Sequence, residues 1–189
     1  MPLPLTDEQI IKQVQQGQTE LFGLLVERYE VKMKRYARKF LYQTDDIDDL
    51  VQEIMIKCFV NIKSFKTDKR FSPWIYRIAH NEFINAIKKK TKEPLPFFDP
   101  DTLFPHPVAR ETADGPLREQ EIKNTVEKYL NQLEVKYREP LILYYLEELS
   151  YQEIADILRL PTSTVGVRIN RAKAALQKIQ QSTNQSEIV

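Results

Sequence analysis

The sequence predicts an all-α protein made of two small helical domains that are joined by a flexible, acidic, proline-rich linker. Many stretches repeat apolar residues at helical spacing, few runs alternate apolar and polar residues, and the 189 residues include only four glycines. Residues 93–116 carry six prolines, an excess of acidic residues and no apolar period, which predicts the linker. We therefore expect one domain over residues 1–92, a second over 117–181, and a frayed tail over 182–189.

The first domain is expected to begin with a short helix and a long one. Thr6 and Gln9 have the spacing of a capping box for a short helix that Gly17 can end. A long amphipathic helix should follow over about Thr19–Leu41, and Thr44 can cap the helix after it.

That third helix has the clearest periodicity in the chain. Its apolar stripe contains Ile47, Leu50, Val51, Ile54, Met55, Cys58, Phe59 and Ile62. Because Cys58 belongs to this stripe, we expect it to be a buried apolar residue and not a reactive thiol or a metal ligand. The outer face begins with four carboxylates, those of Asp45, Asp46, Asp48 and Asp49. Helix capping needs fewer, so the excess favours a partner with a basic surface.

A basic loop, Lys63–Phe71, precedes the fourth helix. Ser72 and Pro73 have the pattern of an N-cap followed by a proline at the first helical position, so a helix is expected over Trp74–Lys89. Its predicted core stripe contains Ile75, Ile78, Ala79, Phe83, Ala86 and Ile87. A second, polar stripe contains Arg77, Asn81, Asn85 and Lys88, with His80 near it.

This fourth helix has the side chains of a nucleic-acid surface. Amide and guanidinium groups hydrogen-bond base edges, and Phe71, Trp74 and Tyr76 could stack on unpaired bases. The alternative is that Trp74 anchors the core and that the Asn side chains are merely solvated.

The second domain should contain two helices followed by a helix-turn-helix. The first two are expected over Leu117–Gln132 and Tyr137–Glu147, with Leu141, Leu143, Leu146 and Leu149 in the core. Ser150–Lys178 then has the outline of a helix-turn-helix.

Capping signals define the two helices of this motif. Ser150 and Glu153 form a capping box, Leu160-Pro161 ends the first helix, and Thr162 can cap the second. The core face contains Ile154, Ala155, Leu158, Val165, Ile169 and Ala172, and the outer face contains Thr164, Arg168, Arg171 and Lys173. The second helix can therefore lie in a major groove, although a solvated helical hairpin with incidental basic residues would show the same pattern.

Charge is segregated along a chain whose formal net charge is only +1. Lys63–Lys92 holds nine basic residues against two acidic ones, and Arg159–Lys178 holds five basic residues and no acidic one. By contrast, Thr44–Lys57 and Glu93–Glu121 are acidic. Such local basic surfaces can bind nucleic acid even where the total charge is near zero.

The sequence also indicates the compartment. A single cysteine excludes an internal disulfide, and no apolar run approaches the roughly 20 residues of a membrane span. Residues 1–9 lack the basic start and apolar core of a signal peptide. We expect a cytoplasmic protein without membrane insertion.

Three stretches together resemble the extracytoplasmic-function (group 4) sigma factors of bacterial RNA polymerase. DDIDDLVQEIMIKCFVNIKSF is similar to the helix that binds core polymerase in that family, and FSPWIYRIAHNEFINAIKKK to its −10 melting and recognition helix. LEELSYQEIADILRLPTSTVGVRINRAKAAL is similar to its −35 helix-turn-helix. A lone helix-turn-helix is weakly specific, whereas the three stretches in this order around an acidic linker are strongly so.

The resemblance implies three sets of functional residues. The core-polymerase set would be Asp48, Asp49, Gln52 and Glu53, facing the β′ clamp coiled coil, with the apolar Leu50 and Val51 behind them. The −10 set would be Lys66, Lys69, Arg70, Trp74, Arg77, Asn81, Asn85 and Lys88, with Asn81, Asn85 and the Ser64–Ser72 loop capturing a flipped base. The −35 set would be Thr162, Ser163, Thr164, Val167, Arg168, Arg171 and Lys173.

The resemblance also implies partners, and this sequence departs from the family pattern at several positions of the helix-turn-helix. The partners would be core polymerase, including its β flap, promoter DNA that is double-stranded at −35 and single-stranded at −10, and an anti-sigma factor. No cofactor, metal or catalytic activity is implied. Ser163 replaces the usual Gly, Gly166 and Val167 replace a basic residue and Ser, and Arg159 occupies a turn position that is commonly Gly.

Two other functions fit parts of the sequence. A stand-alone helix-turn-helix regulator would bind duplex DNA tightly without polymerase. A metal-dependent phosphoryl-transfer enzyme could use Asp45, Asp46, Asp48, Asp49 and Glu53, but the two histidines are remote and no glycine-rich phosphate loop is present.

Overall fold

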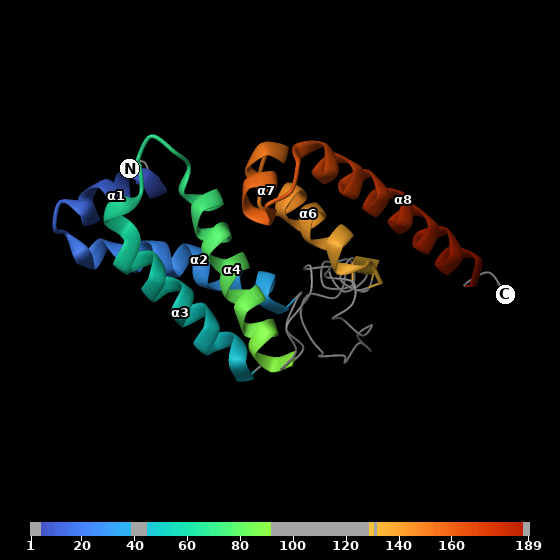
Figure 1. The fold of residues 1–189 in the computed structure, drawn as a ribbon, viewed down its shortest axis with the longest axis horizontal. Helices are drawn as coiled ribbons and strands as arrows, with labels where there is room; N and C mark the ends of the chain where they lie inside the picture. The colour runs from blue at the N-terminus through green and yellow to red at the C-terminus, as the bar shows by residue number, and fades with distance from the viewer. Residues whose placement is uncertain (1–4, 39–44, 92–128, 131, 187–189) are drawn as a thin grey trace. The chain divides into compact units, whose positions relative to one another are not determined.

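The computed structural model describes residues 5–38, 45–91, 129–130 and 132–186, and every regular element within these ranges is a helix (Figure 1). The helices form two compact units, one built on α1–α4 and the other on α6–α8. The all-α, two-domain prediction is thus confirmed. The predicted linker, the cap at Thr44 and most of the helix expected over Leu117–Gln132 lie outside the described residues.

The first unit is a bundle around α3. Its elements are α1 (Asp7–Gln15), a 3₁₀ turn (Thr19–Leu21), α2 (Phe22–Arg38), α3 (Asp45–Asn61), a second 3₁₀ turn (Ile62–Ser64) and α4 (Phe71–Thr91). Helix α3 packs against both α2 and α4, and α1 packs against α2 and the second 3₁₀ turn. Within this unit, α3 and α4 each keep one face that carries exposed polar side chains.

Helix α1 begins and ends as its sequence predicts. The Thr6 hydroxyl accepts the backbone N–H of Gln9 at 3.3 Å, and the Gln9 side chain accepts the backbone N–H of Thr6 at 2.9 Å. Gly17 follows with φ of +109°, a conformation that glycine adopts without steric cost. The next helix was expected from about Thr19, but Thr19–Leu21 forms a separate 3₁₀ turn, a common entry to an α-helix.

Helix α4 begins earlier than predicted, at Phe71 and not after a cap at Ser72. The backbone N–H of Phe71 donates to Glu8 Oε1 of α1 at 3.0 Å. A carboxylate from another helix therefore satisfies the first backbone N–H of α4, in place of the predicted local cap at Ser72. Pro73 still lies in the first turn, where its missing N–H is not needed.

The core of this unit follows most of the predicted stripes, although Leu50, Ile78 and Ala86 are only half-buried. Ile47, Val51, Ile54, Met55, Cys58 and Ile62 of the α3 region are buried, as are Ile75, Ala79, Phe83 and Ile87 of α4. The prediction that Cys58 is buried is confirmed. Phe59 is 40% exposed and lies edge-on to Phe22 at 5.1 Å between ring centroids, because the stripe reaches the margin of α3 there.

The second unit contains α6 (Val135–Tyr145), α7 (Tyr151–Leu158) and α8 (Thr162–Ser186). Helix α6 packs along α8. Leu141, Leu143 and Leu149 are buried as expected, whereas Leu146 is 45% exposed because α6 ends at Tyr145 and Leu146 lies at its C-cap. Helix α8 continues to Ser186, into the stretch that was expected to fray.

Candidate nucleic-acid interface

The exposed face of α3 carries the predicted acidic residues. Asp48, Asp49 and Glu53 are exposed, and so is Gln52. The side chains of Asp45 and Asp46 are outside the described set. Val51 and Leu50 were expected behind this face; Val51 is only 1% exposed and lies in the core beneath it, and Leu50 is half-buried.

Lysines hold two of these carboxylates in place. Lys34 Nζ lies 3.1 Å from Asp48 and 2.7 Å from Glu30. Hydrogen bonds to Glu30 and then to Asp48 raise the pKa of Lys34. Because each ion pair is largely exposed, it orients the carboxylate more than it stabilises the fold.

A second lysine joins α3 to α4. Lys57 Nζ lies 2.9 Å from Glu53 and also contacts Glu82 of α4. Hydrogen bonds to Glu82 and then to Glu53 raise the pKa of Lys57. The carboxylate of Glu53 is therefore positioned through Lys57 by the helix that carries the predicted −10 residues.

The loop between Ser64 and Phe71 presents the predicted basic side chains. Lys66, Lys69 and Arg70 are exposed, and the loop turns back on itself where the Lys69 N–H donates to the Lys66 carbonyl at 3.0 Å. Phe65 and Phe71 are buried at its two ends with ring centroids 5.7 Å apart. The loop thus has an apolar base and a cationic rim.

Only one of the three aromatic residues expected to stack on bases is accessible. Phe71 and Tyr76 are fully buried, and Tyr76 packs edge-on to Tyr36 at 5.2 Å, so stacking by these two is ruled out. Trp74 is half-buried, and its ring lies 5.3 Å from Phe65 and 5.6 Å from Phe71. Trp74 therefore fits both predicted roles in part, because it packs under the loop as a core residue would and still exposes part of its ring for stacking on a base.

The predicted polar stripe of α4 lies on the accessible side of the helix. Arg77, Asn85 and Lys88 are exposed and Asn81 is half-buried. Trp74, Arg77 and Asn81 follow one another at spacings of three and four residues. The loop and this stripe therefore combine cationic, amide and aromatic groups within one compact unit.

The first helix of the helix-turn-helix begins at the predicted capping box. The Ser150 N–H donates to Glu153 Oε2 at 2.7 Å, and the Glu153 N–H donates to Ser150 Oγ at 3.3 Å. The helix ends where Arg159 adopts φ of +55° and the Leu160 N–H donates to the Ala155 carbonyl at 3.1 Å. This left-handed residue explains why glycine is common at that turn position, although arginine occupies it here.

Thr162 does not cap α8 as predicted, because it is the first residue of the helix. The N–H groups of Thr164 and Val165 donate to the carbonyl of Pro161 at 2.9 and 3.2 Å. The hydroxyl of Thr162 pairs with Gln152 Oε1 at 3.0 Å. Thr162 therefore ties α8 to α7.

Helix α8 divides into a buried and an accessible face as its period predicts. Val165, Ile169 and Ala172 are fully buried, which confirms the predicted core. Ser163, Val167 and Arg171 are exposed, and Thr164, Arg168 and Lys173 are half-buried.

Gly166 faces the first helix of the motif. A Cβ atom at this position would lie 3.3 Å from Tyr151 Cε2 and 3.7 Å from Tyr151 Cδ2. The Tyr151 ring in turn packs against Tyr144 at 5.1 Å. The glycine therefore accommodates a tyrosine, so it does not leave a gap on the outer face of α8.

Tyrosines of α6 contact two of the predicted −35 residues. Lys173 Nζ lies 5.2 Å from the centroid of the Tyr145 ring, and its hydrogen bond to Tyr145 is the main cause that raises the Lys173 pKa. Arg171 Nη1 donates to the Tyr137 hydroxyl at 3.4 Å. These contacts could not be predicted from the sequence, because they depend on how α6 packs along α8.

Comparison with known proteins decides the family. The Sigma-70 region 2 family model matches residues 25–93, and the Sigma-70, region 4 model matches residues 123–176. The ECF RNA polymerase sigma factor SigW of Bacillus subtilis is 36% identical over 176 residues, covering 89% of this chain and 93% of that protein. The chain belongs to the ECF sigma factor family.

Other relatives agree with this sigma factor assignment. The ECF RNA polymerase sigma-E factor of Escherichia coli (strain K12) is 33% identical, covering 91% of this chain and 93% of that protein. The sigma factor RpoE of Bartonella quintana, solved in complex with the anti-sigma factor NepR, is 28% identical, covering 85% of this chain and 96% of that chain with a TM-score of 0.65. CnrH, solved with the cytosolic domain of CnrY, shares the fold with a TM-score of 0.65 at 24% identity, covering 93% of this chain and 97% of that chain.

The described part of the sigma factor shows neither a cluster of metal ligands nor a membrane-spanning helix. Within it, no three His, Cys, Asp or Glu side chains come together as metal ligands. None of its described helices is both long enough and apolar enough to cross a membrane.

Proposed function

We propose that this sigma factor binds core polymerase through α3 and directs initiation by holding the melted −10 strand on the first unit and the −35 duplex on the second. The observation that carries the proposal is the loop of residues 65–70, whose exposed Lys66, Lys69 and Arg70 adjoin the half-buried ring of Trp74 and the polar stripe of α4. Cationic and aromatic groups together are what single-stranded nucleic acid requires.

Strand capture follows from the chemistry of this surface. Extruding a base costs a few kcal/mol, and stacking on an aromatic ring returns about 1–3 kcal/mol per base. Hydrogen bonds from Asn81 and Asn85 to the base edges would add to this, and the lysines would neutralise backbone phosphates. Melting then needs binding energy alone, so the chain requires no catalytic activity of its own.

The acidic face of α3 suits the polymerase as its partner. Asp48, Asp49 and Glu53 are exposed on one helix, and two of them are oriented by Lys34 and Lys57. A basic coiled-coil partner would be attracted to this face, which increases the association rate and fixes the register more than it increases affinity.

The first turns of α8 would read the −35 duplex. Ser163, Thr164 and Arg168 offer hydrogen bonds, and the exposed Val167 is suited to a thymine methyl group. Since Gly166 faces Tyr151, its missing side chain removes nothing from this surface.

The cellular context follows from the same function. Transcription places the chain in the cytoplasm, where core polymerase and DNA are found. RpoE of Bartonella quintana was solved with the anti-sigma factor NepR. By likeness to that relative, we infer that an anti-sigma factor regulates this chain.

Run-off transcription with purified core polymerase on genomic fragments tests the proposal. We expect new start sites when the chain is added, and their upstream sequences would give the −10 and −35 elements. Failure to find any start site would contradict the proposal. Tight binding of duplex DNA by the free chain would instead favour a stand-alone regulator.

A charge reversal tests the polymerase surface. The double variant D48K/D49K should lower the affinity for core polymerase at least tenfold, about 1.4 kcal/mol or more, with unchanged helicity. The matched control is E20K/E27K, which makes the same change of net charge at exposed positions outside α3. Equal losses in both variants would show that total charge matters and that the α3 face does not.

A further inference from the structure

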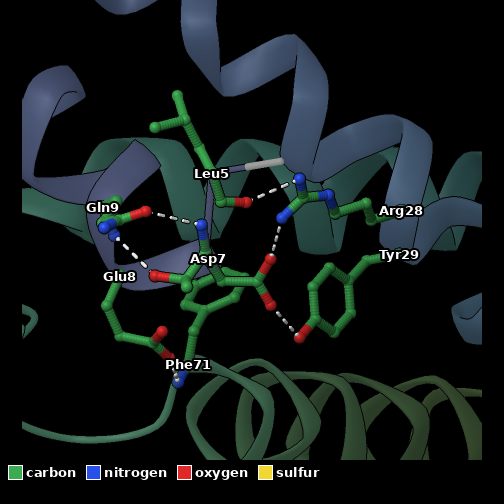
Figure 2. A network of polar contacts seen from close by, with 8 residues as sticks. Leu5, Asp7, Glu8, Gln9, Arg28, Tyr29 and Phe71 are labelled. Atoms are coloured by element: carbon green, nitrogen blue, oxygen red, sulfur yellow. Dashed lines mark hydrogen bonds and ion pairs between the residues drawn. The ribbon is translucent and has the colours of Figure 1, made fainter. Parts of the chain in front are cut away.

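Helix α1 reaches both ends of the cationic loop. The Gln15 side-chain amide donates from Nε2 to the carbonyls of Ile62 at 2.8 Å and Phe65 at 2.9 Å. At the other end, Glu8 Oε1 accepts the backbone N–H of Phe71 at 3.0 Å (Figure 2). Two side chains of one short helix therefore hold the backbone where the loop begins and where it ends.

Helix α1 is itself fixed to the bundle. Asp7 accepts hydrogen bonds from Arg28 Nη1 and from the Tyr29 hydroxyl, each at 2.6 Å, and Arg28 Nη2 donates to the Leu5 carbonyl at 2.8 Å (Figure 2). The Tyr29 ring lies edge-on to Phe71 at 5.3 Å. The support for the loop is therefore continuous from α2 through α1 to the first residue of α4.

The loop is anchored at its two ends by Phe65 and Phe71, and these anchors lie in a different environment from the basic side chains between them. Phe65 and Phe71 are 6% and 0% exposed, and Glu8 and Gln15 are half-buried. The basic side chains between the anchors face solvent. The side-chain polar atoms of Glu8 and Gln15 bond the loop backbone, so they can influence DNA binding through the loop.

We propose that Glu8 and Gln15 are positioning residues that hold the 65–70 loop in the conformation that receives a −10 base. This inference rests on the proposed function of the loop. A loop that is ordered before binding avoids the entropy cost of becoming ordered in the complex. The two attachments need opposite hydrogen-bonding groups. The Phe71 N–H needs an acceptor at residue 8, and the carbonyls of Ile62 and Phe65 need a donor at residue 15.

The experiment measures binding of the holoenzyme to a fluorescent single-stranded oligonucleotide that carries the non-template −10 sequence of a promoter mapped by run-off transcription. Glu8→Ala removes one hydrogen bond to the loop backbone and Gln15→Ala removes two, and each variant should weaken binding about five- to tenfold. Glu8→Gln keeps an acceptor and should lose less than about threefold. The matched controls, Glu20→Ala and Gln16→Ala, change the same residue types at exposed positions and should bind normally.

A second set of measurements separates positioning from general destabilisation. Affinity for core polymerase should be unchanged in every variant. Ile10→Val trims a fully buried α1 side chain on the opposite side of the helix from Glu8 and Gln15, and it should leave strand affinity intact even if it lowers stability as much as Glu8→Ala does. Equal loss of strand affinity in Ile10→Val would overturn the proposal.

Amide hydrogen exchange tests the hydrogen bond between Phe71 and Glu8 in the absence of DNA. The Phe71 amide should exchange about tenfold faster in Glu8→Ala than in the wild-type chain, and at an unchanged rate in Glu20→Ala. Faster exchange together with wild-type strand binding would overturn the positioning role. Failure of the wild-type holoenzyme to bind the strand would instead contradict the proposed function, while the exchange rates would still report on the anchor.

Discussion

Cys58 of α3 is fully buried, and its burial makes the stability of the fold depend on pH in the range where the thiol ionises. Burial raises the pKa of the Cys58 thiol from 9.0 to about 12. The unfolded chain therefore releases this proton at a lower pH than the folded chain does. Stability from the neutral thiol is complete below about pH 9 and is lost as the pH rises towards about 12.

We predict that the free energy of unfolding of the wild-type chain falls relative to that of Cys58→Ala between about pH 9 and pH 12, by up to about 1.4 kcal/mol per pH unit. Urea unfolding of both chains across this range measures the difference, and the other titrating groups are common to both. Parallel curves for the two chains would contradict the predicted linkage.

Gly166 lowers the stability of helix α8 but leaves room for the Tyr151 ring. A glycine inside a helix costs about 1 kcal/mol relative to alanine, but a Cβ at this position would lie 3.3 Å from Tyr151. We predict that Gly166→Ala changes stability by less than about 0.5 kcal/mol in the wild-type chain and stabilises by about 1 kcal/mol in a Tyr151→Ala background. Urea unfolding of the four chains gives the coupling. A full gain in the wild-type background would show that the tyrosine yields without cost.

At the scale of single residues, the sequence predicted exposure better than it predicted contacts. The periodicity identified Val165, Ile169 and Cys58 as buried, because burial follows directly from helix phase. It could not distinguish Trp74 from Tyr76, since both aromatic residues fit either environment until the bundle around them is known. The lysines that orient Asp48 and Glu53 were missed for the same reason.

At the scale of the helices, the capping box at Ser150 is the local signal that the structure reproduces most directly. Ser150 and Glu153 exchange hydrogen bonds at the start of α7. We predict that Ser150→Ala lowers the free energy of unfolding by about 1 kcal/mol. Far-UV circular dichroism during urea unfolding measures the loss, and Ser163→Ala, the same change at an exposed position within α8, serves as the control.

Single tryptophan fluorescence sharpens this test. Trp74 lies in the first unit and is the only tryptophan of the chain. If the capping box acts on its own unit, the midpoint reported by Trp74 stays unchanged in Ser150→Ala while the dichroism curve shifts. A shift of both signals would show that the two units unfold together.

Helix starts that depend on another helix could not be predicted from the sequence. The caps at Thr6 and Ser150 are local, since both partners lie within three residues, and both were found correctly. The start of α4 depends on Glu8, which is 63 residues away from Phe71, and the start of α8 depends on a carbonyl of the preceding turn. Local patterns therefore predicted that these helices exist but not the residues at which they begin.

At the scale of the whole molecule, a nearly neutral chain carries two cationic surfaces on two separate units. The formal net charge is +1, yet the loop of the first unit and the outer face of α8 are both basic. Each unit has its own core, and the two cationic surfaces belong to different units. Their contributions to promoter binding should then be independent.

A double-mutant cycle measures this independence. We predict that Lys69→Gln and Arg168→Gln each weaken holoenzyme binding to a mapped promoter by about 1 kcal/mol. Each should also reduce the slope of the logarithm of the binding constant against the logarithm of the salt concentration by about 1. The double variant should lose the sum of the two within about 0.5 kcal/mol. The comparison pair, Lys66→Gln with Lys69→Gln, lies within one loop whose residues share a turn, and it should deviate from additivity. A coupling above about 1 kcal/mol between Lys69 and Arg168 would mean that polymerase joins the two units into one recognition surface, and the two cationic faces could no longer be treated as independent binding modules.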